Sequence, residues 1–285
     1  NTTIPRVKEA LFAQNGTFVL IRYLRDDNRT VETYSAQIPN EGVGTGEGGE
    51  LKGVFLPQDI STITISPDSK KIFYMVGFGG GSLGFVSGPQ NESRQQIFNS
   101  PFTEWLSLWP LEKIISLTTK PSGGILGYTF NLNSTTKTFE KTTGGLPGLT
   151  VLPSHNGKFV LLGTSPDTGT TLAVYDVKNK TTLTLGNKTL PEKCVWSADD
   201  EKIYCSVPAV IPAGTLPDSW YQGTLFFRDR LWSIDPTEGT SEMVADFTKE
   251  TGKNIDAINL MVSKDNSYLF LVNKKDLSLW SVKLD

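Results

Sequence analysis

The chain has 285 residues, a formal net charge of −3 at pH 7 and a pI near 5.4. This charge provides no basic field for nucleic acid or an anionic lipid surface. The sequence also contains no run of about 18 apolar residues that could span a membrane. Abundant Thr, Val, Ile and aromatic residues, punctuated by 27 Gly and 16 Pro, favour an all-β fold. The sequence begins with Asn1 rather than Met, so we expect a processed product whose signal or anchor preceded it.

A strand–turn–strand pattern recurs along the chain. Two short apolar segments flank a polar turn at residues 10–23, 63–76, 150–163, 194–207 and 260–273, with a degenerate copy at 105–118. A second polar turn follows in the same phase at 89–93, 133–137, 177–181 and 235–239. The spacing from Ser154 to Ser197 is 43 residues. Each unit therefore predicts four antiparallel strands, a to d, which is the content and period of a propeller blade.

The repeat predicts six blades in one domain that spans residues 1–285. We place them at residues 9–57, 58–101, 102–147, 148–191, 192–248 and 257–285. The last unit has strands a to c only, and residues 1–8 are placed to complete it, so the propeller would be closed by pairing of its termini. A seventh blade would need residues that precede Asn1. Two loops exceed the repeat: residues 39–50 between strands c and d of the first blade, and residues 208–223 between b and c of the fifth.

The hairpins carry a family resemblance. Ser66-Pro67-Asp68, followed by Lys-Lys-Ile, resembles the WD-like repeats of TolB-type and peptidase-associated propellers, and Ser197 and Ser263 begin partial matches. The order of the segments NTTIPRV, TEWLSLWP, LPEKCVWS, DSWYQG and DAINLMVS is also similar to a family of bacterial cell-envelope propellers. That resemblance covers nearly the whole chain. It implies an exported or membrane-anchored protein and brings no ligand or reaction.

The chain has two cysteines, Cys194 and Cys205. If they lie on hairpin strands around residues 198–201, Ser197 pairs with Lys202. The same register then puts the cysteines opposite each other, with Cβ atoms about 4.5–5.5 Å apart. This is close to disulfide distance, so we expect a disulfide, which favours an oxidising, extracytoplasmic compartment. The alternative is a pair of buried free thiols.

Residues 77–85, GFGGGSLGF, match two catalytic signatures at once. One is the dinucleotide pattern G-x-G-x-x-G, and the other is the nucleophile elbow G-x-S-x-G around Ser82. Both need a helix after the loop, whereas the following residues predict strand, turn and strand. The elbow also needs an imidazole base, and the only histidine, His155, lies in a turn of another blade. We therefore expect a hairpin loop and a catalytically silent Ser82.

Other enzyme and metal signatures are incomplete. Residues 165–172, SPDTGTTL, approach the aspartate box of sialidase-type propellers, but Leu172 replaces its aromatic residue and the match falls between strands b and c. The acidic turns at 26–28 and 199–201 lack the alternating ligand spacing of an EF-hand. One histidine without a Cys/His cluster argues against zinc. We expect no cofactor, no metal and no catalytic residue.

The remaining candidate for function is a surface. The b–c and d–a loops share one face of a propeller, and we select from them five candidate partner-binding residues: Arg25, Asp26, Lys120, Trp220 and Tyr221. Adjacent aromatics on a proline-rich insertion suit a protein or glycan partner. The alternative is that the insertion folds back and buries them against the blade.

The sequence thus predicts a non-catalytic, extracytoplasmic β-propeller that acts as a binding scaffold for another envelope protein or a surface polysaccharide. We expect no nucleic acid partner and no membrane span in these residues. The alternative is the propeller module of a larger hydrolase, or a glycosidase-like enzyme. An upstream signal or anchor would favour the scaffold, and an appended α/β-hydrolase domain would favour the enzyme.

Overall fold

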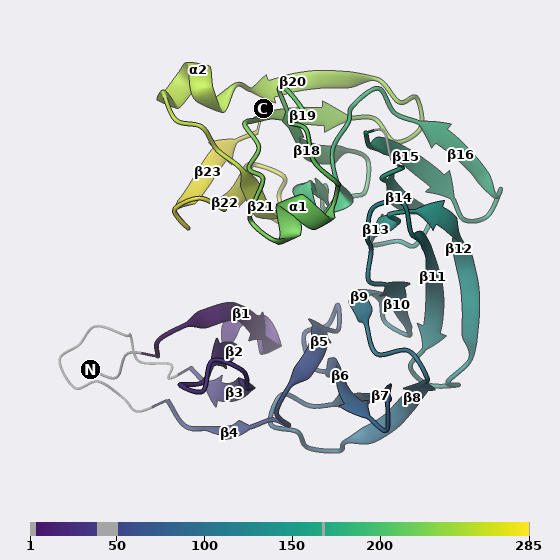
Figure 1. Ribbon diagram of the computed structural model, residues 1–285, viewed down its shortest axis with the longest axis vertical. Coiled ribbons are helices and arrows are strands. Elements are labelled where there is room, and N and C mark those ends of the chain that lie inside the picture. Colours follow the sequence, from purple (N-terminus) through teal and green to yellow (C-terminus); the bar gives the residue numbers. More distant parts are fainter. Residues whose placement is uncertain (1–3, 39–50, 167–168, 285) are drawn as a thin grey trace. The chain divides into compact units, whose positions relative to one another are not determined.

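The computed structural model describes residues 4–38, 51–166 and 169–284. Six sheets follow one another along the chain, and in each of them the strands that neighbour in sequence are hydrogen-bonded (Figure 1). The fold class is a six-bladed β-propeller, as the repeat predicted. The loop expected at residues 39–50 lies outside the described residues.

Two compact units make up the chain. The first comprises Asn1–Leu117 and Asn131–Glu140, and the second comprises Thr118–Phe130 and Lys141–Asp285. The first blade consists of β1 (Val7–Ala13), β2 (Phe18–Leu24), β3 (Val31–Gln37) and β4 (Gly53–Phe55), with the 3-10 turn Gln14–Gly16 after β1. The second blade consists of β5 (Ile60–Ile65), β6 (Ile72–Phe78), β7 (Gly81–Ser87) and β8 (Gln95–Ser100). The third blade belongs partly to each unit and consists of β9 (Trp105–Leu111), β10 (Ile114–Thr119), β11 (Leu126–Asn133) and β12 (Phe139–Pro147).

The second unit holds the last three blades and both short helices. The fourth blade consists of β13 (Thr150–Pro153), β14 (Phe159–Thr164), β15 (Thr171–Asp176) and β16 (Thr181–Thr184). The fifth consists of β17 (Cys194–Trp196), β18 (Ile203–Pro208), β19 (Asp229–Ile234) and β20 (Ser241–Ala245). The sixth consists of β21 (Ala257–Val262), β22 (Tyr268–Asn273) and β23 (Leu279–Lys283). A 3-10 turn at Pro191–Lys193 precedes β17, and the helices are α1 (Asp218–Tyr221) and α2 (Phe247–Thr251).

The sixth sheet has three strands among the described residues, as its sequence predicted. Residues 1–8 were expected to supply its fourth strand. Val7 and Lys8 instead belong to β1, where Val7 pairs with Tyr23 of β2. The expectation is therefore wrong for Val7 and Lys8, which the first blade uses for its own ladder. Residues 1–3 lie outside the described residues.

The turn between the first two strands of the second blade explains why the repeat is visible in sequence. The Ser66 hydroxyl donates to Asp68 Oδ1 (2.6 Å) and accepts from the Lys71 N–H (2.9 Å). Between them, Ser69 has the left-handed φ of 58° that the turn requires. The corresponding turns have the same hydroxyl bonds at Ser154, Ser197 and Ser263. Each serine and its acidic or amide partner close the turn locally.

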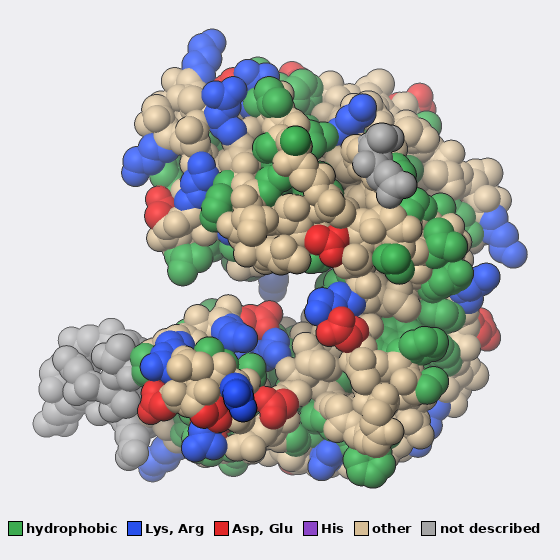
Figure 2. Space-filling view, viewed as in Figure 1, with side chains coloured by type: hydrophobic (Ala, Val, Ile, Leu, Met, Phe, Trp, Pro, Cys, Tyr) green, Lys and Arg blue, Asp and Glu red, His purple; other side chains and the backbone are tan. Residues whose placement is uncertain are grey.

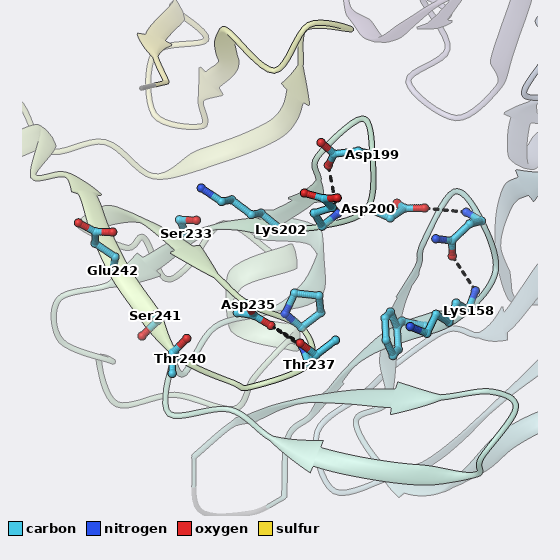
Figure 3. Close-up of a pocket in the computed structure, with 14 residues that line it drawn as sticks. Lys158, Asp199, Asp200, Lys202, Ser233, Asp235, Thr237, Thr240, Ser241 and Glu242 are labelled. Carbon is cyan, nitrogen blue, oxygen red and sulfur yellow. Dashed lines mark hydrogen bonds between the residues drawn. The ribbon is translucent and has the colours of Figure 1, made fainter.

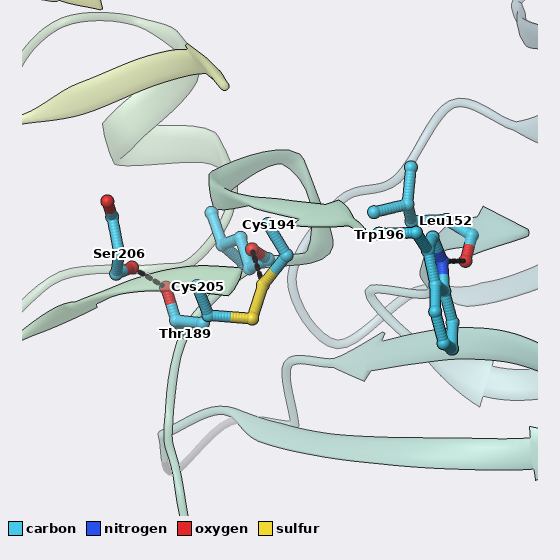
Figure 4. Close-up of a disulfide and its surroundings, with 7 residues drawn as sticks. Leu152, Thr189, Cys194, Trp196, Cys205 and Ser206 are labelled. Atoms are coloured by element: carbon cyan, nitrogen blue, oxygen red, sulfur yellow. Dashed lines mark hydrogen bonds between the residues drawn. A yellow bond between two sulfur atoms is a disulfide. The ribbon is translucent and has the colours of Figure 1, made fainter. Parts of the chain in front are cut away.

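The predicted disulfide is confirmed and lies in a buried core. Cys194 and Cys205 are bonded to each other and pair directly across β17 and β18, in the register that the hairpin predicted (Figure 4). Trp196 belongs to the same core cluster and stacks on Phe159 of the fourth blade, with ring centroids 6.2 Å apart. Its indole N–H donates to the carbonyl of Leu152 (3.0 Å). The hairpin therefore packs against the neighbouring blade.

Candidate functional site

The glycine run with two catalytic signatures is a hairpin loop. β6 and β7 join through a two-residue turn at Gly79 and Gly80, which have φ of 59° and 83°. Ser82 lies in β7 and is 1% exposed, and its hydroxyl donates to the carbonyl of Phe102 (2.7 Å). A strand, not a helix, follows the loop. The Ser82 hydroxyl is therefore a structural donor within the second blade.

The sialidase-like segment also lies in a connection between strands b and c. β14 ends at Thr164 and β15 begins at Thr171, with Leu172 fully buried inside β15. Residues 167–168 lie outside the described residues. The position of the segment agrees with its interpretation as a turn signature.

The single histidine joins two blades. His155 lies in the turn between β13 and β14, and its Nδ1 is 2.8 Å from Asp200 Oδ1 of the corresponding turn in the fifth blade. The backbone N–H groups of His155 and Asn156 donate to the same carboxylate (3.0 and 2.7 Å). The Asp200 side chain is 4% exposed and the His155 side chain 59%. The imidazole was expected to be a solvent-facing turn residue, and it is one that also contacts a neighbouring blade.

A polar groove of about 780 Å³ lies beside these turns (Figure 3). Its charged lining residues are Lys158, Asp199, Asp200, Glu201, Lys202, Asp235 and Glu242. The hydroxyls of Ser197 and Thr237 donate to Asp199 and Asp235 and lower the pKa of each carboxyl. No group of three or more His, Cys, Asp or Glu side chains in the described part of the chain could hold a metal ion. Asp199 and Asp235 close their own turns, whereas Asp200 accepts hydrogen bonds from the turn of the fourth blade.

On the opposite end of the fifth blade, a long insertion connects β18 to β19. We call residues 209–228 the insertion. Its apolar residues Leu216, Trp220, Leu225 and Phe227 form one buried cluster with Leu190. Trp220 is 4% exposed. The expectation that Trp220 faces a partner is therefore wrong, because the insertion folds back and buries the indole ring.

A fully buried ion cluster anchors the insertion. Lys193 Nζ lies 2.8 Å from Asp229 Oδ2 and 2.6 Å from Asp256 Oδ1, and all three side chains are 0% exposed. The Trp220 indole N–H and the Phe227 backbone N–H both donate to Asp256 (3.1 Å each to Oδ2). Burial raises the pKa of Asp229, and Lys193 opposes that rise.

The ion cluster is the functional feature that sequence reasoning missed. Removing charges from water opposes folding, so such a cluster contributes little net stability. Its consequence here is positional: it fixes where Trp220 and Phe227 lie. Lys193, Asp229 and Asp256 are charged residues at or next to the start of an apolar strand, in LPEKCVW, FRDRLW and NIDAINL. A charge flanking a buried strand was the only available signal, and it does not reveal its partners.

A second anchor joins the insertion to the loop between β10 and β11. Asp218 of α1 accepts hydrogen bonds from the Ser122 hydroxyl (2.8 Å) and the Gly123 N–H (2.6 Å). Burial opposes ionisation of Asp218, but these two bonds prevail and lower its pKa. A Cβ on Gly123 would lie 2.5 Å from Thr215 Cγ2, so only glycine permits this approach. The structure thus brings the loop of the candidate residue Lys120, itself exposed, to the insertion.

Part of the insertion remains exposed to solvent. Tyr221 is 37% exposed and Phe226 42%. Lys274 Nζ lies 4.0 Å from the Trp220 ring centroid and 5.9 Å from that of Phe226, and Lys275 Nζ lies 5.8 Å from Phe226. The next turn residue, Leu277, is 73% exposed. We call Tyr221, Phe226, Lys274, Lys275 and Leu277 the aromatic–basic patch.

The electrostatics of the patch differ from those of the polar groove. The Tyr221 hydroxyl donates to Glu192 Oε1, and burial together with this carboxylate raises the pKa of Tyr221. Burial also raises the pKa of Glu192. On the face seen in Figure 2, basic side chains gather over α2 and the strands of the sixth blade.

The candidates Arg25 and Asp26 belong to the first unit. They lie in the turn between β2 and β3, where Arg25 Nη1 is 3.4 Å from Glu32 Oε1 and Asp26 is 3.6 Å from Arg6 Nη2. The Asp27 carboxylate accepts from the Arg29 and Thr30 backbone N–H groups. Arg25 and Asp26 are therefore engaged within the first unit and form no part of the site in the second unit.

No family model and no curated protein matches the chain. Several solved structures are similar to the chain. The β-propeller domain of the Trilobed protease from Pyrococcus furiosus is 12% identical, with a TM-score of 0.60 over 100% of this chain and 82% of that one. TolB from Acinetobacter baumannii is 12% identical, with a TM-score of 0.55 over 83% of this chain and 53% of that one. An acylaminoacyl peptidase from Pyrococcus horikoshii is 11% identical, with a TM-score of 0.63 over 98% and 45%.

These similarities concern the fold. They confirm the resemblance to TolB-type and peptidase-associated propellers as a shared architecture. The chain spans about half the length of TolB and less than half of the peptidase. Because the same fold occurs in TolB and in proteases, it does not by itself decide between a scaffold and an enzyme module.

Proposed function

We propose that the chain is a non-catalytic scaffold that binds a protein partner through the exposed surface of the insertion and the adjoining residues 120–125 and 274–277. We call this surface the insertion face. One observation carries the proposal: the insertion is anchored at Trp220 by a buried ion cluster and at Asp218 by the neighbouring loop, yet presents Tyr221 and Phe226 to solvent.

Rigid presentation of aromatic side chains favours binding. An exposed loop that is already ordered loses little conformational entropy when a partner docks. Tyr and Phe supply large contact areas with few rotatable bonds, and aromatic residues are enriched at interfaces. The anchoring of Trp220 therefore contributes indirectly, as a positioning residue for Tyr221 and Phe226.

We place the protein outside the cytoplasm. The support is the disulfide between Cys194 and Cys205, since disulfides persist in oxidising compartments. No helix in the described ranges is long and apolar enough to cross a membrane. Adding a maleimide while cells are lysed under denaturing conditions tests the assignment: we expect neither cysteine to react until a reductant is added.

A propeller module of a larger hydrolase is the second candidate. It is favoured by the alignment of 98% of this chain with 45% of an acylaminoacyl peptidase. In such a module the chemistry would belong to another domain. Ser82 and His155, which an elbow within this chain would need, both make structural contacts. The sequence encoded beside this chain in its gene distinguishes the two candidates.

The scaffold is tested by site-specific photo-crosslinking in native envelopes. A p-benzoyl-phenylalanine at Tyr221 or Phe226 should give one discrete adduct that excess unlabelled protein suppresses. The same group at Met243, 48% exposed on β20 of the same blade, is the matched control and should not give that adduct. An identical adduct pattern from all three positions would refute the insertion face as a specific surface.

A further inference from the structure

The lysines of the aromatic–basic patch are poorly compensated. Lys275 is exposed, and its ammonium group makes no ion pair with any described residue. Lys274 donates to the Trp220 carbonyl and stacks over the same indole ring, which uses one of its three donors. Burial lowers the pKa of Lys274, and the Asp256 carboxylate opposes this shift. Both ammonium groups therefore lie near the exposed Phe226 ring, 5.9 and 5.8 Å from its centroid.

The carboxylates of the same surface are already engaged within the protein. Their donors are Tyr221 for Glu192, Ser122 and Gly123 for Asp218, and Ser278 for Asp276. The bonds from Ser278 also lower the pKa of Asp276. None of these carboxylates makes an ion pair with Lys274 or Lys275 among the described residues. The five residues of the aromatic–basic patch include two lysines and no acidic residue, although the chain as a whole carries −3.

Apolar groups adjoin these charges. Phe226 is 42% exposed and lies near both lysines, and Leu277, two residues after Lys275, is 73% exposed. Val210, at the start of the insertion, is 69% exposed. An exposed apolar group next to an uncompensated cation suits a ligand that carries both an apolar side chain and a negative charge.

We infer that the insertion face recognises an acidic segment of its protein partner, with an apolar side chain beside the acidic residues. The inference rests on the proposed function and specifies the partner's chemistry. Partner carboxylates would contact Lys275 and the free donors of Lys274, and the apolar side chain would pack on Phe226 and Leu277. Charge complementarity of this kind sets the partner's identity and speeds encounter.

Two other anionic ligands fit less well. Binding to an anionic membrane through a basic segment relies on clusters of about 4–8 Lys or Arg residues, and this patch offers two lysines, one of them partly engaged. Nucleic acid binding would require a longer basic stripe that follows the phosphates. The overall charge of −3 opposes both of these extended polyanions.

Selection from a random twelve-residue peptide display library on the immobilised protein tests the inference. We expect selected peptides to be enriched in Asp and Glu next to Leu, Ile or Phe. Their affinity should fall about tenfold in Lys275→Glu, where like charges meet, and about tenfold in Phe226→Ser. Both positions are exposed, so the variants should fold. Lys178→Glu, an exposed turn lysine of the fourth blade, carries the same charge change and should bind as the wild type does.

The outcomes separate the two proposals. Peptides that need Phe226 but lack acidic residues, and that ignore Lys275→Glu, would refute the acidic segment while leaving the insertion face intact. Selected peptides that bind Phe226→Ser and Lys275→Glu unchanged would contradict both. Sedimentation with vesicles containing phosphatidylserine provides the third arm: binding that Lys275→Glu abolishes would identify a membrane surface in place of the acidic segment and overturn the inference.

Discussion

The serine-closed turns and the insertion are both polar connections between strands, but they are held in different ways. In the serine-closed turn of the second blade, Ser66 and Asp68 bond to each other and to residues within five positions along the chain. In the insertion, Trp220 and Asp218 bond to Asp256 and Gly123, which are 36 and 95 positions away. The bonds that close this turn therefore form from local sequence, whereas the bonds that anchor the insertion form only once neighbouring blades are in place.

The strongest test of this difference is Lys193→Ala. Removing the cation leaves Asp229 and Asp256 buried without their ion pair, and the free energy of unfolding should fall by about 3–5 kcal/mol. Urea titration followed by tryptophan fluorescence measures the loss. Lys202→Ala, an exposed turn lysine, is the control and should change stability by less than about 0.5 kcal/mol. Equal effects of the two variants would contradict a distant anchor.

Reduction of the disulfide should have the next largest effect. Cys194 and Cys205 are 11 positions apart, so the bridge closes a short loop and belongs with the local features. Its loss should lower the free energy of unfolding by at most about 3 kcal/mol and reduce the melting temperature, as calorimetry with and without a reductant would show. Two free thiols detected in denatured, unreduced protein would contradict the bridge.

Features that depend on neighbours along the chain could be predicted from the sequence, whereas features that depend on distant residues could not. The blade period, the glycine hairpin and the pairing of Cys194 with Cys205 all depend on neighbours along the chain, and each was predicted. The burial of Trp220 was left as one of two alternatives, because it depends on Asp256 in another blade. The position of the Lys120 loop beside the insertion depends likewise on the bond between Gly123 and Asp218, which sequence spacing does not reveal.

Trp220→Phe isolates the indole donor of the distant anchor. The aromatic ring is largely kept, but the N–H that donates to Asp256 is removed, so the free energy of unfolding should fall by about 1–3 kcal/mol. Hydrogen exchange should show faster opening of residues 209–228, while the turn at Ser197 stays as protected as in the wild type. Uniform loss of protection throughout the second unit would show that the insertion does not open independently of the rest of that unit.

The smallest expected effect concerns the serine-closed turn at Ser263 and is a loss of stability at acid pH. The hydroxyl of Ser263 donates to Asp265 (2.6 Å), as does the Ser267 backbone N–H, and these bonds lower the pKa of Asp265 from its ordinary value of 3.8 to about 2. Folding therefore favours the ionised carboxylate. Its contribution to stability is fully present above the unfolded pKa and is lost as the pH falls through the folded pKa, a window from about pH 4 to pH 2.

Carboxyl carbon shifts followed by NMR in that window measure the pKa directly. In Ser263→Ala the pKa of Asp265 should rise toward 3.8, because the largest of its stabilising bonds is removed, while Asp235, whose bonds come from its own turn, should titrate as before. If the insertion is held independently of this turn, its hydrogen exchange should not respond to the substitution. A change in exchange at residues 209–228 would show that the two classes of connection are coupled and would break the distinction between them.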